Sequence, residues 1–271
     1  MINLKVLKNI LKRDLLHGIY NNQYKYLTFI MFILLLSISN GNAIKNEGGN
    51  IVDLFFVNYK DMGYAMGIGE MNRLPIIWIL INVFVAFIIG DFIKTDLKNN
   101  AVYVLTRTKS FKEYWISKVL WVFINVLFLY VGLFIITYFT GCLFINNSIE
   151  WSSLSNILIK NMLVQDITAK EFMVSLFLLY FTTSFTISLL QINLTLFIKS
   201  RYSFLIIILT ACLSIFIDNQ MFPAIHSMIL KHNYFDSIHE LTILKSIIYN
   251  IVFSSIAIYS GYKIITKKDI I

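Results

Sequence analysis

The chain has 271 residues, of which 58% are hydrophobic and only 14% charged, with a net charge of +8. Soluble domains are about 45–50% apolar and about 25% charged, so a water-soluble fold of this length would leave much apolar surface exposed. The composition therefore excludes an ordinary soluble domain and predicts an all-α integral membrane protein.

The first 23 residues predict an amphipathic helix that lies in the membrane interface before the first span. Leucines recur at three- or four-residue steps along one side of this helix, and basic residues fall mostly on the other. The leucines are Leu4, Leu7, Leu11 and Leu15, and the basic residues are Lys5, Lys8, Lys12 and Arg13. A generic membrane anchor is the simpler interpretation of the same pattern. The segment has no continuous apolar core and no small-residue cleavage site, so we do not expect a signal peptide.

Six apolar stretches are long enough to cross a bilayer, which takes about 20 apolar residues as helix and fewer where aromatic ends lie in the interface. They cover residues 24–39, 74–92, 116–139, 172–197, 202–217 and 243–265. If the N-terminus is cytoplasmic, sixteen of the 23 Lys and Arg residues fall on the cytoplasmic side, as the positive-inside rule requires. We therefore expect both termini in the cytoplasm, and we interpret the basic charge as a topology signal rather than as a nucleic-acid site.

The longest predicted cytoplasmic loop, residues 93–115, lies between the second and third spans. Its pattern predicts a short helix, then a basic turn, then the capped start of the third span. Ser110 and Glu113 have the spacing of a capping box, so a new helix should begin at Phe111. The apolar residues that share one face of the short helix are Leu97, Ala101, Val104 and Leu105. A solvated positive-inside loop and a protein docking site both fit this organisation.

On the outer side, residues 40–73 and 141–171 predict polar loops, whereas residues 218–242 are too apolar for a free loop. We expect short helices that dip into the outer leaflet, since non-helical backbone at that depth must be covered by protein. The segment also holds His226, His232 and His239, followed by Glu240. Their spacings of six, seven and one match no familiar ligand pattern, so no metal site is predicted.

The sequence lacks the motifs of several chemistries. It contains no G-x-x-x-x-G-K-[ST] segment for nucleotide phosphates, no H-E-x-x-H and no G-x-S-x-G. No predicted span carries an acid or a base in its middle, where such residues mark proton and ion paths. The intramembrane amides Asn82, Asn125, Gln191 and Asn193 are expected to form interhelical hydrogen bonds. We therefore predict no enzymatic activity in this chain, and any uphill transport would take its energy from a partner.

These features together resemble the six-span permease subunits of ABC-2 type transporters. The most specific segment is 105–118, Leu-Thr-Arg-Thr-Lys-Ser-Phe-Lys-Glu-Tyr-Trp-Ile-Ser-Lys. It is similar to that family's basic turn, aromatic-rich helix start and lysine at the entry to span three. Asp91 stands where the family often has an acid that closes span two. The chain departs from the family at Asn99, Asn100 and Ala101, where a Gly-Thr pair is frequent, and no proline precedes Arg107.

The resemblance implies a single permease domain in a bacterial plasma membrane that pairs with a second copy or with a homologous permease. It implies export of a peptide or another amphiphile, as in antimicrobial peptide export or self-immunity. The loop helix would be the coupling helix, which docks into a groove of a separate ABC ATPase. That partner would bind Mg-ATP, and this chain would hold no cofactor. The implied docking residues are Leu97, Asn100, Ala101, Val104, Leu105 and Arg107.

Two other interpretations stay open. A non-transporting membrane scaffold, sensor or immunity protein would share the topology but would need no ATPase. A membrane enzyme could use the outer histidines, and metal analysis with His226→Ala and His239→Ala would test that idea.

Overall fold

The computed structural model describes residues 3–64, 74–108 and 110–267, and within these ranges the chain is helical with no strand. Five helical segments there are long and apolar enough to cross a membrane. They are Leu4–Asn46, Ile76–Asn99, Phe111–Phe144, Ala169–Phe197 and Ile243–Lys267. The prediction of an all-α membrane protein is confirmed at this level. The predicted fifth span corresponds to α9 (Ser200–Phe216), which is apolar but has only 17 residues.

The N-terminal segment and the first predicted span form one helix and are not separated as predicted, whereas a position in the membrane interface stays a prediction. Helix α1 runs without a break from Leu4 to Asn46, so the predicted boundary at residue 23 lies inside one helix. Its buried residues recur every three or four positions along the whole length and pack mainly on α6. They are Ile10, Asp14, Gly18, Asn22, Tyr26, Phe29, Ile33, Ser37, Gly41 and Ile44.

The predicted leucine face lies beside this buried stripe rather than along it, and Leu11 and Leu15 pack against the edge of the core. Leu4 is 76% exposed, and Leu7, Leu11 and Leu15 are only half-buried. The stripe next to them carries small and polar residues that let α1 approach α6 closely. At Gly18, an added Cβ would overlap the indole ring of Trp121 on α6. The close approach therefore requires glycine at this position.

Part of the predicted outer loop 40–73 is a buried helix. Asn50 and Asp53 form a capping box at the start of α2 (Ile51–Tyr59). Eight of the nine residues of α2 are buried, because its aromatic side chains pack inside the bundle. The helices α7 (Ser153–Leu158) and η2 (Lys160–Met162) follow in the second predicted outer loop, and Ser152 and Ser155 donate hydrogen bonds of 2.6 Å to the Asp53 carboxylate.

The predicted cytoplasmic loop contains two short helices. Helix α3 (Ile76–Gly90) is followed by α4 (Phe92–Asn99) and α5 (Ala101–Thr108), with a break at Asn100. Helix α6 begins at Phe111 as predicted, and the Ser110 hydroxyl accepts the capping hydrogen bond from the Glu113 amide. The Glu113 carboxylate instead accepts from the backbone N–H of Asn3 at 2.9 Å. Residues 1–2, Lys109 of the predicted turn and residues 65–73 lie outside the described ranges.

The second half of the chain packs around α8 (Ala169–Phe197), which contacts α10 (Ile243–Lys267), α6 and α9. Between α9 and α10 lie two short 3-10 helices, η3 (Pro223–Ser227) and η4 (Ile229–Lys231), and most of their residues are buried. The segment therefore contains short helices, and their predicted dip into the outer leaflet stays a prediction.

Three of the four intramembrane amides bond to another helix, as predicted. Gln191 and Asn193 donate to the carbonyl oxygens of Ala86 (2.9 Å) and Ala257 (2.7 Å). Asn125 accepts from the hydroxyl of Tyr26. Asn82 differs, since its amide donates within its own helix, to the Trp78 carbonyl at 2.9 Å.

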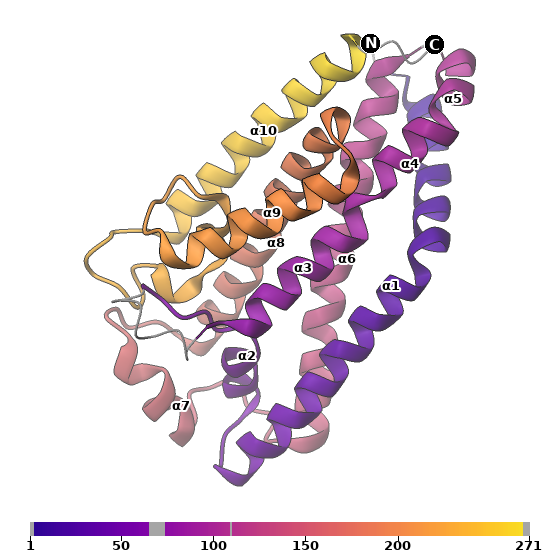
Figure 1. The fold of residues 1–271 in the computed structure, drawn as a ribbon. Coiled ribbons are helices and arrows are strands. Elements are labelled where there is room, and N and C mark those ends of the chain that lie inside the picture. The colour runs from indigo at the N-terminus through magenta and orange to yellow at the C-terminus, as the bar shows by residue number, and fades with distance from the viewer. Residues whose placement is uncertain (1–2, 65–73, 109, 268–271) are drawn as a thin grey trace.

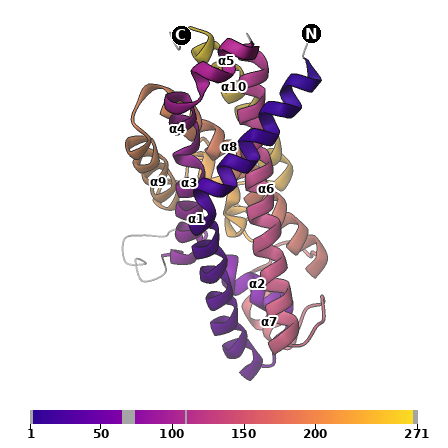
Figure 2. The same ribbon diagram turned by 90° about the vertical axis from the view of Figure 1, so that its right-hand side faces the viewer.

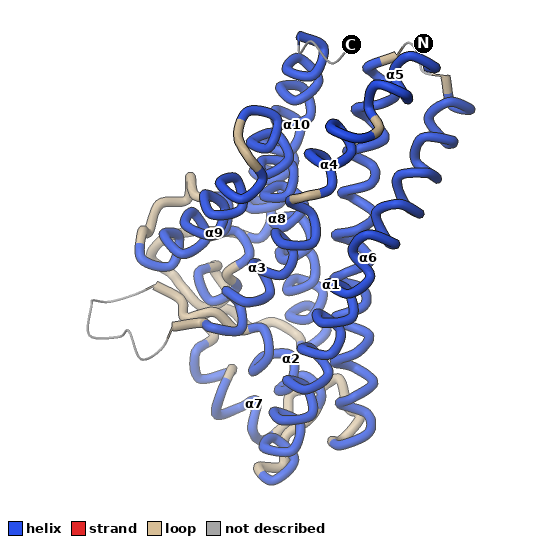
Figure 3. Tube along the Cα trace, turned by 45° about the vertical axis from the view of Figure 1, so that its right-hand side comes forward, coloured by secondary structure: helices blue, strands red, loops and turns tan. Residues whose placement is uncertain are grey.

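Two views at right angles give the arrangement of these helices. The start of α1 and the end of α10 lie at the same end of the bundle as α5 (Figures 1 and 2). Helices α2 and α7 lie toward the opposite end, and the tube view shows how loops connect the helices there (Figure 3).

Candidate functional site

Four charged side chains meet inside the bundle near the end where α5 lies. Arg13 and Asp14 come from α1, Asp96 from α4 and Lys118 from α6. The Lys118 Nζ lies 2.8 Å from Asp14 Oδ2 and 2.6 Å from Asp96 Oδ2. The Arg13 Nη2 lies 2.5 Å from Asp14 Oδ1 and 2.9 Å from Asp96 Oδ1. Each carboxylate therefore binds both cations, and the two positive and two negative charges balance.

Neutral groups complete the coordination of these charges. The Tyr114 hydroxyl donates to Asp96 Oδ2 at 2.6 Å, and the Ser117 hydroxyl donates to Asp14 Oδ2 at 2.7 Å. The Lys118 ammonium also lies 4.6 Å from the ring centroid of Tyr114. Lys118 and both carboxylates are buried. Buried charges are tolerated when they are paired and hydrogen-bonded, and these are.

The charged cluster fixes the position of α4 and α5. A helix of eight residues is not stable alone in water, and both α4 and α5 have that length. Asp96 joins α4 to α1 and α6, and Asn100 at the break donates to the same carboxylate at 3.3 Å. The pair of short helices is thereby tied to the two longest helices of the described chain.

The structure places the predicted docking residues on different sides of this unit. Ala101 and Leu105 are 0% and 1% exposed and belong to the hydrophobic core, so they are not available to a partner. Leu97, Asn100 and Val104 are half-buried, and Arg107 is exposed.

The outward face of α5 consists of Val102, Tyr103, Thr106 and Arg107, and Tyr103 is 70% exposed. The predicted docking residues do not include the first three of these, because the sequence pattern predicts one continuous helix from Leu97 to Leu105. The break at Asn100 changes the phase of the buried stripe, and Ala101 and Leu105, four residues apart, then form the inner face of a new helix.

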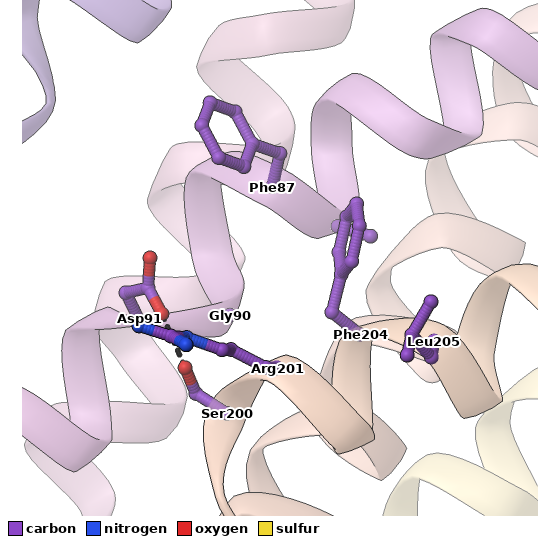
Figure 4. Close-up of a pocket in the computed structure, with 8 residues that line it drawn as sticks. Phe87, Gly90, Asp91, Ser200, Arg201, Phe204 and Leu205 are labelled. Carbon is purple, nitrogen blue, oxygen red and sulfur yellow. Dashed lines mark hydrogen bonds between the residues drawn. The ribbon is translucent and has the colours of Figure 1, made fainter.

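A second cluster of polar groups surrounds Asp91, which caps the C-terminal end of α3. The Ser200 hydroxyl at the start of α9 donates to Asp91 Oδ1, and Lys25 Nζ of α1 lies 3.4 Å from Asp91 Oδ2. Arg201 lines the same pocket of about 290 Å³, together with Phe87 and other apolar residues (Figure 4). The acid at the end of the second predicted span thus joins α3 to α9 and α1.

The three histidines of the predicted outer segment do not converge on one point. His226 and His232 lie on either side of Ser246. His239 instead bonds to Asp236 at 3.0 Å and stacks on Tyr64, with ring centroids 3.7 Å apart. The described residues contain no group of three or more His, Cys, Asp and Glu side chains arranged to hold a metal ion.

Burial dominates the titration of residues 218–242, the predicted outer segment. It lowers the pKa of His226 and of His232 to about 4, so both imidazoles are neutral at pH 7. Burial also raises the pKa of Asp61 to about 6, although the backbone N–H groups of Leu230 and Gly63 donate to its carboxylate.

Comparison of the chain with known protein families, with curated proteins and with solved structures found no match.

Proposed function

We propose that the chain is the membrane-spanning subunit of an ATP-driven transporter of the ABC-2 type, and that a separate ABC ATPase binds and hydrolyses Mg-ATP. One observation carries this proposal. Helix α5 presents an exposed face at one end of the bundle, while ion pairs of the buried Asp96 tie the adjoining α4 to α1 and α6. A partner that pushes on α5 would therefore move two long helices rather than a free loop.

The outward residues of α5 have the chemistry of a docking surface. Aromatic residues and arginine are enriched in protein interfaces and often dominate their binding energy. Tyr103 supplies a large exposed ring, and Val102 and Arg107 lie beside it on the same face. In this proposal Tyr103 and Val102 enter the groove of the ATPase, and Arg107 meets its acidic rim.

The proposal includes six crossings, with both ends of the chain in the cytoplasm of a bacterium. Two ends on one side of a membrane require an even number of crossings, and α9 is the sixth apolar helix. At about 1.5 Å per residue, its 17 residues fall short of a full crossing. Its aromatic residues Tyr202 and Phe216 lie near its two ends, where interfacial aromatic side chains shorten the apolar length that a crossing needs.

We propose a peptide or another amphiphile as the transported substrate. A groove of about 320 Å³ between α6, α8 and α10 combines aromatic and polar groups. Phe123 and Phe185 line it together with the hydroxyl and amide groups of Thr182, Asn250 and Ser254. Such a mixed surface suits a molecule with both apolar and hydrogen-bonding parts.

The test is affinity purification of the tagged chain from its native membranes in mild detergent, followed by an ATP hydrolysis assay. We expect an ATPase to co-purify, and we expect Tyr103→Asp to reduce its yield at least tenfold. The matched control is Leu4→Asp, because Leu4 is equally exposed near the same end of the bundle but lies outside α5. Equal yields with both variants, or purification without any ATPase, would refute the proposal and favour a membrane scaffold, sensor or immunity protein.

A further inference from the structure

Two buried histidines share one serine hydroxyl in the segment before α10. The His226 Nδ1 lies 2.9 Å from the Ser246 Oγ, and the His232 Nε2 lies 2.8 Å from the same oxygen. All three residues are at most 2% exposed.

The other nitrogen of each imidazole faces a backbone carbonyl oxygen. The His226 Nε2 lies 3.0 Å from the Gln220 oxygen, and the His232 Nδ1 lies 2.8 Å from the Met228 oxygen. A carbonyl oxygen only accepts hydrogen bonds, so each of these nitrogens must carry the hydrogen. A neutral imidazole has one N–H group. His226 is therefore the Nε2–H tautomer and His232 the Nδ1–H tautomer.

This assignment leaves the cluster one proton short. Both nitrogens that face Ser246 carry lone pairs, whereas the hydroxyl has a single hydrogen and can donate to only one of them. The other nitrogen then faces the serine oxygen at hydrogen-bond distance with no hydrogen between them. One added proton completes the cluster, because a protonated histidine donates to Ser246 while Ser246 donates to the other histidine. We infer that His226, Ser246 and His232 form a binding site for a single proton.

The surroundings favour one proton and oppose a second. The Tyr249 ring stacks on His226 with centroids 3.9 Å apart, and an aromatic face attracts a cation. Two imidazolium groups on one serine oxygen would repel each other in a buried site.

The charged groups nearby in the described segment have other partners. Lys231 bonds to the carbonyl oxygens of Ser214 and Ile215 and to Asp218. Asp61 accepts from backbone N–H groups, Asp236 pairs with His239, and Lys245 donates to the Glu240 carbonyl.

The site joins the segment between α9 and α10 to the first turn of α10. His226 belongs to η3, His232 follows η4, and Ser246 lies near the start of α10. The protonation state of the site would therefore act on the attachment of η3 and η4 to α10. This inference concerns the outer segment alone and does not depend on the proposed ATPase.

The test is nitrogen-15 NMR of the histidine side chains in the full chain, reconstituted in lipid nanodiscs. Single His→Gln variants assign the four imidazoles. At pH 7.5 we expect the Nε2–H tautomer for His226 and the Nδ1–H tautomer for His232. If both were Nε2–H tautomers, Ser246 could accept from His232 and donate to His226, no proton would be missing, and the inference would be wrong.

A pH titration of the same samples tests the proton itself. We expect the pair to bind one proton before either residue binds a second. In His232→Gln, the amide can donate to Ser246 and supply the missing hydrogen. His226 in that variant should therefore bind a proton at least tenfold more weakly than the wild-type pair. His17→Gln is the control, since His17 lies on α1 and bonds only to Asn21 within the described chain. Equal proton affinity in His232→Gln and the wild type would overturn the inference.

Discussion

Lys118 depends on two carboxylates from other parts of the chain. It lies in the eighth position of α6, and sequence patterning places it at the headgroup level as a basic residue near a membrane entry. In the structure its side chain is fully buried between Asp14 and Asp96. These partners come from positions 104 and 22 residues earlier in the sequence, so no local pattern identifies the contact.

Replacement of Lys118 by methionine should leave Asp14 and Asp96 with only Arg13 as a charged partner. Breaking a buried ion pair from one side costs about 3–5 kcal/mol, and we expect a loss of unfolding free energy of this size. Chemical denaturation in detergent, followed by loss of helical signal, measures the change. Lys112→Met is the control, because Lys112 is exposed on the same helix. A loss below about 1 kcal/mol for Lys118→Met, within the usual effect of one neutral hydrogen bond, would contradict the assigned role.

Gly18 offers a second test at the residue scale. A Cβ at this position would overlap Trp121, so Gly18→Ala should force α1 away from α6. Overpacking of this kind typically costs about 1–3 kcal/mol. At Gly132, in the middle of α6, an added Cβ would meet no atom within 4 Å. Gly132→Ala should therefore gain up to about 1 kcal/mol from helix propensity. Thermal unfolding of the two variants should shift in opposite directions, and equal shifts would argue against the close contact of α1 with α6.

At the scale of elements, hydropathy predicts where the long helices lie. The end of α8 at Phe197 and the start of α10 at Ile243 coincide with the predicted limits. The patterns fail where packing between distant segments decides the structure. The continuity of α1 depends on its fit to α6, and the burial of α2 depends on aromatic contacts across the bundle. The break at Asn100 likewise moved the exposed face of α5 away from the predicted docking residues other than Arg107.

The segment η3–η4 should lose stability in acid. The pKa values of His226 and His232 are lowered in the folded state from 6.5 to about 4, so the unfolded segment binds protons more readily. Their contribution is complete above pH 6.5 and is lost as the pH falls toward 4. Asp61 acts in the opposite direction, because its pKa is raised from 3.8 to about 6 and the folded state binds its proton more readily. Two histidines outweigh one carboxyl group, so the net effect of acid is destabilising.

Hydrogen exchange measures this effect once the intrinsic pH dependence of exchange is removed. Protection factors of the amides in residues 223–232 should fall between pH 7 and pH 4.5. The middle of α6 is the internal reference, and its protection should stay constant over this range. Protection that rises in η3–η4 as the pH falls would show that Asp61, and not the histidine pair, dominates the titration.

At the scale of the whole molecule, the exposed surface indicates what surrounds the bundle. Large apolar side chains are exposed along α1, α9 and α10, including Leu27, Leu35, Leu209, Ile251 and Ile256. A surface of this kind needs lipid or another membrane subunit around it. The surface at the end of the bundle where α5 lies is more polar than these apolar faces, because basic and polar residues surround Tyr103 there. The molecule therefore offers one surface suited to the membrane and another suited to a water-soluble partner.

The central claim is that a partner ATPase binds the outward face of α5. The most direct measurement is photo-crosslinking in native membranes, with a photoreactive amino acid placed at Tyr103 and, in a separate variant, at Leu143. Both positions are highly exposed, but Leu143 lies near the other end of α6. Our account predicts that the probe at position 103 captures a protein with a nucleotide-binding P-loop, identified by mass spectrometry, and that the probe at position 143 does not. Capture of no such protein from position 103, or equal capture from both positions, would contradict it.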